Sequence, residues 1–451
     1  RMEKKAVYGM TEGSPAKLLL TFTLPMLIGN LFQQFYNMVD SVVVGRFVGA
    51  NALAAVGATG SLNFLFFSMS FGISAGVGVV LSQYFGADKS DMVGRSFANG
   101  MYLLALVSAV MSIVGIASAR AVLELLNTPA TILDDAVLYM RVSCAGILAI
   151  AAYNGVAAVL RALGDSKTPL YFMVISCIIN IGLDLLFVIS FQWSVFGVAL
   201  ATVIAQLVAA ICAFIYAFYK IPILRVNREG RRVKPDIMMK CFKLGFPIAL
   251  QNSLIAFSCI FLQRVVNGFG EDVVAANTAL SRIEQLVQQP YNSLGAALTT
   301  YTGQNIGANK IDRVKQGHRV GVICVVVFSL LMLIPGQFFG KEIMGIFVQD
   351  QEVIEIGAKG FAITSPFYVF LGMIYVSRGI LNGAGDAAYS MINGLMEITG
   401  RVGFAKPLTM IPEIGMWGVF LTTGLTWTLV SVVSMHRYSR GKWKNKGIIK
   451  H

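Results

Sequence analysis

Two acidic residues lie inside long apolar stretches, where a charge is costly. Asp40 ends an apolar run that begins near residue 17, and Asp184 falls in a run near residues 169–191. A charged side chain at the bilayer centre costs about 2.5 to 3.5 kcal/mol on insertion scales, so an acid kept there usually faces a polar cavity and has a function. A carboxyl group in that setting can bind a small cation or a proton.

Amide and hydroxyl side chains accompany both acids at helical spacing. The first apolar stretch carries a polar stripe that would lie along one helix face: Gln33, Tyr36, Asn37 and Asp40. Asn180 lies four residues before Asp184, so both side chains can point to the same place. Oxygen ligands of these types suit a small hard cation, and the acids could equally carry protons. The residues alone leave both possibilities open.

The second half of the chain carries charges of both signs inside its apolar stretches. Glu397 and Arg401 are four residues apart, and Arg282 is close to Glu284. Internal ion pairs would let these stretches enter a bilayer, which is the interpretation that we favour. The alternative is that Glu397 contacts a cationic ligand.

Helices that cross a membrane must position these side chains. Of the 451 residues, 56% are hydrophobic and only 13% are charged, and the mean hydropathy is +0.69, a composition foreign to soluble domains. Apolar stretches of about 20 residues recur, each long enough to cross a hydrocarbon core of about 30 Å as a helix. We predict an all-α polytopic membrane protein with about twelve spans, near residues 17–41, 52–82, 97–119, 133–159, 169–191, 195–219, 242–267, 274–304, 319–339, 353–379, 388–411 and 415–436.

The location of the basic residues explains the net charge of +13. They flank alternate spans, at Lys4, Lys5, Lys89, Arg95, Arg161, Lys167, the central loop 220–243, Lys310, Arg313, Lys315 and the tail. The loops between them hold mainly acids, such as Glu271 and Asp272. The positive-inside rule then predicts a multi-pass protein of the cell membrane, of the bacterial inner-membrane type, with both termini cytoplasmic. We expect the first apolar stretch to remain as an anchor, and no nucleic-acid partner.

The chain contains two copies of one unit. Residues 82–89 match residues 303–310, an offset of 304 minus 83, or 221, and the same offset pairs Gly164-Asp165 with Gly385-Asp386. A single register over about 120 residues indicates duplication. We therefore predict two six-helix lobes related by an axis along the membrane normal. The predicted parts are an N-terminal lobe (1–219), a cytoplasmic linker (220–243), a C-terminal lobe (244–436) and a basic cytoplasmic tail (437–451).

Together these features resemble the multidrug and toxic compound extrusion (MATE) family over essentially the whole chain. The residues that carry the resemblance are Pro25, the Asp40-Ser41-Val42-Val43-Val44-Gly45 stretch, the glycine-rich second span ending in Ser82-Gln83 and Gly86-Ala87, and Arg161-Ala162-Leu163-Gly164-Asp165. The resemblance implies an antiporter that exports cationic or amphipathic small molecules against an inward flow of Na⁺ or H⁺. It also implies that the cation or proton site of the N-terminal lobe is formed by Asp40, Asn180, Asp184 and Thr202.

Two further groups of residues have predicted roles. We predict a substrate cavity lined by Gln33, Tyr36, Asn37, Glu397 and Arg401, and gate or loop structure at Arg161, Asp165 and Asp386. Gly72, Gly76 and Gly78 lie inside an apolar span and are interpreted as helix-packing positions rather than a phosphate loop.

Two alternative functions are a flippase, which would move a different substrate, and an enzyme, which would catalyse a reaction. A flippase for lipid-linked oligosaccharide, from the same superfamily of exporters, stays open because arginines lie in spans of the second half, such as Arg264 and Arg401. An enzyme is not expected, since no nucleophile cluster or nucleotide motif is evident. We expect a monomer in contact with membrane lipid, with no cofactor and no metal beyond Na⁺ at Asp40 and Asp184.

Overall fold

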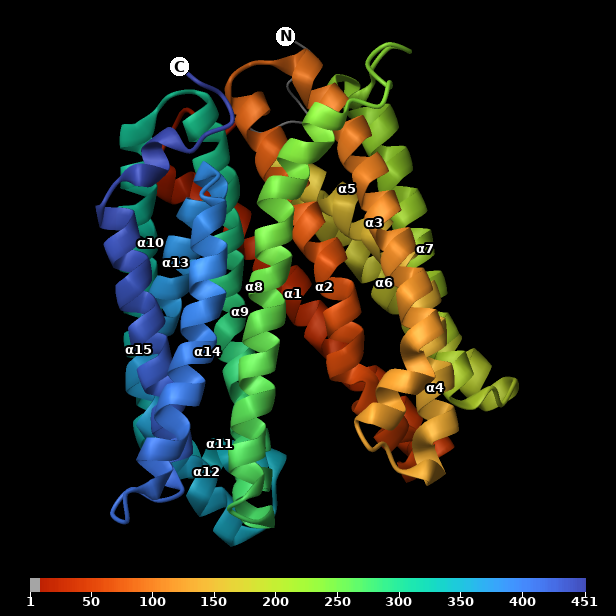
Figure 1. The fold of residues 1–451 in the computed structure, drawn as a ribbon, viewed down its shortest axis with the longest axis vertical. Coiled ribbons are helices and arrows are strands. Elements are labelled where there is room, and N and C mark those ends of the chain that lie inside the picture. Colours follow the sequence, from red (N-terminus) through yellow and green to blue (C-terminus); the bar gives the residue numbers. More distant parts are fainter. Residues whose placement is uncertain (1–8) are drawn as a thin grey trace. The chain divides into compact units, whose positions relative to one another are not determined.

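The computed structural model describes residues 9–451, which form helices and no strands (Figure 1). Lys4 and Lys5, two of the predicted orientation residues, lie outside the described residues. The described chain separates into two compact units. Unit 1 holds residues 9–12 and 24–249, and unit 2 holds residues 13–23 and 250–451. The predicted domain borders at residues 219, 243 and 436 remain predictions.

Two long helices contribute to both units. The first turns of α1 (Pro15–Val43) belong to unit 2, and the helix from Leu24 onward belongs to unit 1. In α8 (Pro235–Asn267) the change falls after Ala249. Each helix has an internal proline within two residues of its change, Pro25 in α1 and Pro247 in α8. A proline inside a helix removes one backbone hydrogen bond, so both positions are weak points of their helices.

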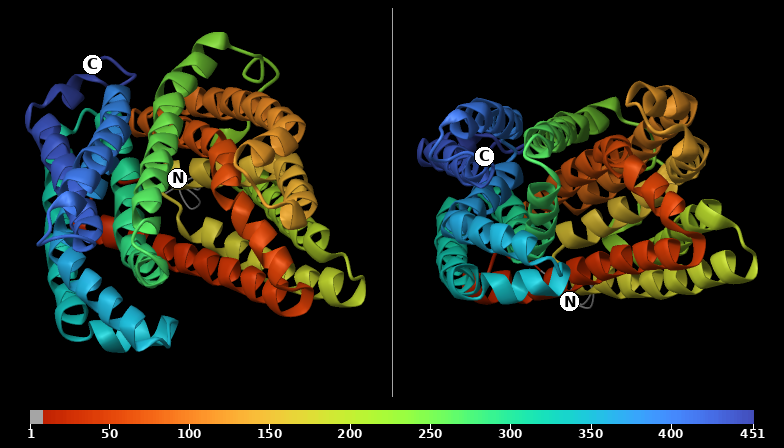
Figure 2. Two further views of the ribbon diagram at one scale, coloured as in Figure 1. Left: turned by 60° about the horizontal axis from the view of Figure 1, so that its bottom comes forward. Right: turned by 90° about the horizontal axis from the view of Figure 1, so that it is seen from below.

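The remaining helices of unit 1 follow one another with short connections. They are η2 (Val44–Val48), α2 (Ala50–Gly86), α3 (Ser90–Leu125), α4 (Ala130–Ala145), α5 (Ile147–Ala162), α6 (Lys167–Leu185), η3 (Leu186–Ser190), α7 (Ser194–Lys220) and η4 (Pro222–Leu224). The segments η2 and η3 are π-helical turns that continue α1 and α6 without a break. Figure 2 shows the helices of this unit, coloured red to yellow-green, gathered into a bundle.

Unit 2 is built from the second half of the chain. Its further helices are α9 (Glu271–Gly307), α10 (Ile311–Phe338), α11 (Gly340–Phe347), α12 (Gln351–Thr364), η5 (Ser365–Phe367), α13 (Tyr368–Ala384), α14 (Ala387–Met410), α15 (Trp417–Ser439) and η6 (Lys442–Asn445). The short α11 lies between two spans and was not among the predicted elements.

Twelve spans were predicted, but fewer helices are both long enough and apolar enough to meet a strict criterion for crossing a membrane. Within residues 9–451, nine helical segments are long and apolar enough to cross a membrane, or ten if α4 and α5, bent by 44°, count as one. The two predicted spans that fall short are α9 and α14, although they are 37 and 24 residues long. Both carry buried charged side chains, Glu284 in α9 and Glu397 with Arg401 in α14. The all-helical, two-lobe membrane fold is confirmed.

The internal repeat appears in the backbone at the predicted offset of 221. Asp88 and Asn309 both have a φ of 57°, and Gly164 and Gly385 have φ values of 88° and 92°. Left-handed backbone of this kind is uncommon and favours Gly, Asn and Asp, so its recurrence at equivalent turns is specific. Helix packing repeats as well: α2 packs on α3 and α5, and α9 packs on α10 and α13. The predicted duplication is therefore present in three dimensions.

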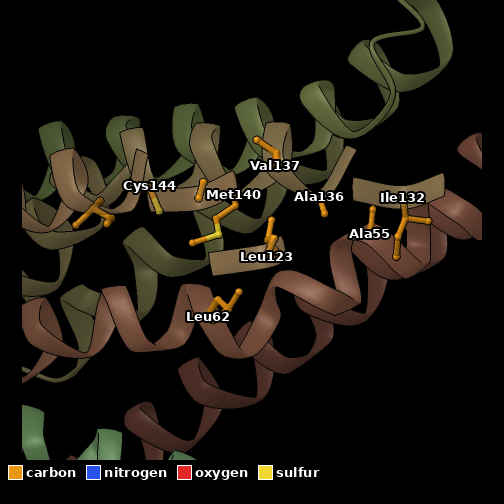
Figure 3. Close-up of a cluster of buried hydrophobic side chains, with 10 residues drawn as sticks. Ala55, Leu62, Leu123, Ile132, Ala136, Val137, Met140 and Cys144 are labelled. Carbon is orange, nitrogen blue, oxygen red and sulfur yellow. The ribbon is translucent and has the colours of Figure 1, made fainter. Parts of the chain in front are cut away.

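Close packing in unit 1 depends on small residues. A Cβ atom added to Gly76 of α2 would lie 2.5 Å from the carbonyl oxygen of Cys241 in α8, and one added to Gly245 would lie 2.7 Å from the Cα of Ile73. The role predicted for Gly72 and Gly76 as packing positions is confirmed, because both face the backbone of α8. Figure 3 shows a second contact region, where α2, α3 and α4 meet through residues such as Leu62, Leu123 and Met140.

Candidate functional site

The two acids predicted from the first half of the chain meet in unit 1. Asp40 lies in the last turn of α1, and Asp184 lies in the last turn of α6. Their carboxyl groups are hydrogen-bond partners. Asp184 is fully buried, whereas Asp40 is partly exposed. One member of the pair is therefore reachable from outside the unit while the other is enclosed.

Thr202 of α7 connects the acids to their polar neighbours. Asn180 donates a hydrogen bond from its Nδ2 to the Thr202 Oγ1 at 3.2 Å. The Thr202 side chain is also a hydrogen-bond partner of Asp40 and of Tyr36. The four residues predicted as the coupling site, Asp40, Asn180, Asp184 and Thr202, thus form one cluster. Their role in coupling remains a prediction.

Two members of the cluster were missed by the sequence analysis. Tyr139 of α4 interacts electrostatically with both Asp40 and Asp184, and Cys177 of α6 lies near Asp40 and Tyr36. Polar residues lie near both at helical spacing, Ser143 four residues after Tyr139 and Asn180 three residues after Cys177, but neither a tyrosine nor a cysteine is a charge that stands out in an apolar span. Their proximity is created by tertiary packing. Tyr36, predicted to line a substrate cavity, is buried and belongs to this acid cluster.

A π-helical turn follows each acid at the same end of the site. The turn η2 begins four residues after Asp40, and η3 begins two residues after Asp184. The two turns pack on each other and on α7. A valine-rich cluster is buried around them, including Val44, Val188 and Val198. Inserted π turns are frequent at functional sites, and here they place a compact apolar layer directly beyond the acid cluster.

The other predicted cavity residues of unit 1 are exposed, unlike Tyr36. Gln33 and Asn37 are exposed on α1. The backbone carbonyl of Asn37 accepts a hydrogen bond from the Ser41 hydroxyl at 3.2 Å. Contact of Gln33 and Asn37 with a substrate remains a prediction.

Unit 2 holds its own buried charges in α9 and α14. Arg401 forms an ion pair with Glu397 and donates a second hydrogen bond to the Ser258 Oγ at 2.9 Å. Both charged side chains are buried. The ion pair that we favoured for these residues is present, and their contact with a substrate remains a prediction. Glu284 accepts a hydrogen bond from the Tyr368 hydroxyl at 3.4 Å, and Arg401 acts on it electrostatically.

The proposed pairing of Arg282 with Glu284 does not occur. Arg282 lies on the exposed side of α9, two residues from the buried Glu284. Residues two apart on a helix point in different directions, so a local pair was geometrically disfavoured from the start.

The predicted gate residues are held by different contacts in the two units. Asp165 caps α6: it accepts hydrogen bonds from the backbone N–H groups of Lys167 and Thr168, both at 3.1 Å, and from the Thr168 hydroxyl at 2.6 Å. Asp386, its equivalent in the repeat, accepts two hydrogen bonds from Arg437 at 2.7 and 2.8 Å. Arg161 is half-buried in the last turn of α5. These contacts hold helix ends in place, and a gating role stays a prediction.

Comparison with known proteins identifies the family. The MatE family model matches residues 25–186 and 247–398, more than half of the chain. The Probable multidrug resistance protein YpnP of Bacillus subtilis is 29% identical over 97% of this chain and 98% of its own length. The Multidrug export protein MepA of Staphylococcus saprophyticus is 22% identical, over 95% of this chain and 93% of its own length.

Solved structures show the same fold. A MOP superfamily transporter from Pyrococcus furiosus superposes with a TM-score of 0.90 at 20% identity, covering 97% of this chain and 98% of that chain. At this level of identity the likeness concerns the fold alone. The family model, which covers both units, establishes more: the chain belongs to the MatE family and is a multi-pass membrane transporter of small molecules, not an enzyme.

Proposed function

We propose that this transporter exports cationic or amphipathic small molecules in exchange for Na⁺ or H⁺, with the driving ion bound at Asp40 and Asp184. The observation that carries the proposal is the hydrogen-bonded pair of carboxyl groups in the last turns of the apolar helices α1 and α6. Two carboxylates in contact repel each other, so a proton or a metal cation must accompany them. The pair can therefore bind or release a proton or cation when the side of the membrane from which it is accessible changes.

The donor set suits either ion. For Na⁺, the carboxyl oxygens and the Thr202 hydroxyl supply hard oxygen ligands. For H⁺, one proton shared by the carboxyl groups neutralises the pair, and the neighbouring Tyr36 and Thr202 provide hydrogen-bonding groups. Both ions remove a net negative charge from the bundle, which is the physical requirement of a coupling site.

The valine-rich layer supports an occluded state. Because η2 and η3 pack together directly beyond the acids, water must pass this layer to reach them from that end of unit 1. If an ion binds while this layer is open, and is released to the opposite side after the layer has closed, it has crossed the site. This is the elementary step of alternating access. A membrane potential adds about 2.3 kcal/mol per charge per 100 mV to that step.

The names of the relatives support small-molecule export. YpnP and MepA are described as multidrug resistance or export proteins. Acids rather than basic residues form the cluster of unit 1, which favours a cationic cargo over the pyrophosphate of a lipid-linked sugar. We further propose that both termini face the cytoplasm, because the basic loops and tail lie at that end of the helices.

The test is efflux of a fluorescent cationic dye from proteoliposomes, with a sodium gradient and a proton gradient imposed separately. Uphill efflux driven by one gradient supports the proposal and names the ion. If neither gradient moves dye and a labelled lipid-linked sugar is flipped instead, the exporter assignment is wrong and the flippase alternative replaces it.

A further inference from the structure

A basic, aromatic cavity lies at one end of unit 2, separate from the buried charges already described. It has a volume of about 540 Å³ and lies between the first turns of α10, the last turn of α15 and η6. Three cationic side chains line it, Lys315 and Arg319 from α10 and Lys444 from η6. All three are exposed, and no carboxylate is among the lining residues. The cavity therefore presents concentrated positive charge.

Stacked rings form the wall of this cavity. The His318 and Tyr438 rings stack with centroids 4.0 Å apart, and Tyr438 stacks on Trp443 at 5.4 Å. The Trp443 ring is 1% exposed and its Nε1 donates to the Tyr438 carbonyl at 2.9 Å. The Nε2 of His318 is buried and has no hydrogen-bond partner among the described residues. The stacked rings therefore give the cavity an aromatic wall.

The cavity changes from polar to apolar along α10. Lys315 and Arg319 lie in its first turns, and Val322 and Ile323 line the cavity deeper along the helix. Ile323 is 56% exposed, and Val327 and Leu330 continue an exposed apolar stripe beyond it. A molecule that fills this cavity must therefore carry a negative head and an apolar extension.

The position in the membrane matches that chemistry. Within unit 2 the same end carries Lys310, Arg313, Arg437, Arg440 and Lys442, whereas the loops at the other helix ends hold acids such as Glu271, Asp350 and Glu413. Basic residues mark the cytoplasmic side, where anionic lipids are enriched, and Trp and Tyr favour the headgroup level. A nucleotide fits less well, because the Tyr438 ring already stacks with both His318 and Trp443, and Trp443 is enclosed.

We propose that this cavity binds one anionic phospholipid of the cytoplasmic leaflet, with its phosphate held by Lys315, Arg319 and Lys444 and its acyl chains along Ile323 and Val327. The site is independent of the proposed transport mechanism. Its occupant would tie the C-terminal segment, through Trp443 and Lys444, to α10 and to the membrane surface. A free phosphate ion shares the chemistry of the lipid headgroup, and competition with inorganic phosphate distinguishes the two.

The experiment is native mass spectrometry of the full-length protein titrated in detergent with phosphatidylglycerol or phosphatidylcholine. We expect one phosphatidylglycerol to be retained in preference to phosphatidylcholine. Neutralising the three cations, in Lys315→Gln/Arg319→Gln/Lys444→Gln, should raise its dissociation constant about a hundredfold, which corresponds to about 3 kcal/mol. The matched control Arg440→Gln/Lys442→Gln/Lys446→Gln removes three exposed charges of the same chain segment outside the cavity, and should change it less than about threefold.

Three results would overturn the proposal: equal weakening by the control variant, equal retention of phosphatidylcholine, or displacement of the lipid by an excess of inorganic phosphate. The first would show diffuse surface attraction, the second the absence of phosphate recognition, and the third a site for free phosphate. If the triple variant unfolds at a lower temperature than the wild type, Arg319→Gln alone carries the test, with an expected weakening of about fivefold.

Discussion

Asn180 in unit 1 and Arg401 in unit 2 occupy equivalent positions of the repeat, 221 residues apart, but their surroundings differ in charge. Asn180 donates to Thr202, next to the paired carboxyl groups of Asp40 and Asp184. Arg401 instead pairs with Glu397 and reaches Ser258. The positions equivalent to Asp40 and Asp184 are Phe261 and Ala405. The two units thus share the same helix packing, whereas their buried charged residues differ.

The two units differ in how their buried carboxyl groups are balanced. In unit 2 the charge of Glu397 is balanced by Arg401, so this pair is complete without a ligand. In unit 1 the acids are paired with each other, and a proton or cation must supply the balance. The π-helical turns also distinguish the two units. Within the described residues they follow Asp40 and Asp184 in unit 1 and do not occur in unit 2. This contrast supports our proposal that the driving ion binds at the carboxyl pair of unit 1.

The largest effect is expected when the internal balance of unit 2 is broken. Arg401→Gln leaves Glu397 buried without its partner, which should lower the free energy of unfolding by about 3 to 5 kcal/mol. Thermal unfolding of the purified protein measures it. The double variant Glu397→Gln/Arg401→Gln removes both charges and should regain most of that loss. If the double variant is as unstable as the single one, Arg401 does not stabilise the protein by balancing the charge of Glu397. The contrast drawn between the two units would then be wrong.

A smaller effect should separate the two equivalent aspartates at the helix ends. Asp386→Ala breaks a two-bonded ion pair with Arg437 and should cost about 2 kcal/mol of stability, because hydrogen bonds to charged groups are strong. Asp165→Ala removes a helix cap and should cost about 1 kcal/mol. Unfolding temperatures of the two variants provide the measurement. Equal losses would mean that the different contacts of these residues do not matter.

The smallest effect concerns a threonine that the repeat places in both units. Thr202→Val removes the hydroxyl that contacts Asp40 and Asn180, and should weaken the apparent affinity for the driving ion about fivefold, or about 1 kcal/mol. Thr423→Val is the matched control, since among residues 9–451 the Thr423 hydroxyl donates only to the backbone carbonyl of Val419 in its own helix, at 3.5 Å. The concentration of ion that half-saturates dye efflux measures both. A similar change in both variants would remove Thr202 from the site.

Much of this arrangement could be predicted from the sequence, and the exceptions have physical causes. Asp40 and Asp184 stand out because charges are rare in apolar spans, and the repeat is visible because its turns reuse Gly, Asp and Asn. Tyr139 could not be found, because it lies on α4, a different helix from either acid, and is brought near them only by helix packing. The π-helical turns were also missed, since Val and Leu after each acid continue an ordinary helical pattern.

The most direct test of the central claim compares wild type with Asp40→Asn in proteoliposomes that measure both gradient-driven uphill efflux and downhill dye exchange. Asp134→Asn is the control, because this exposed acid of unit 1 pairs with Arg120 outside the cluster. We expect Asp40→Asn to abolish uphill efflux while downhill exchange and dye binding persist, and Asp134→Asn to behave as wild type. Unimpaired uphill efflux by Asp40→Asn would contradict the assignment of ion coupling to the carboxyl pair of unit 1.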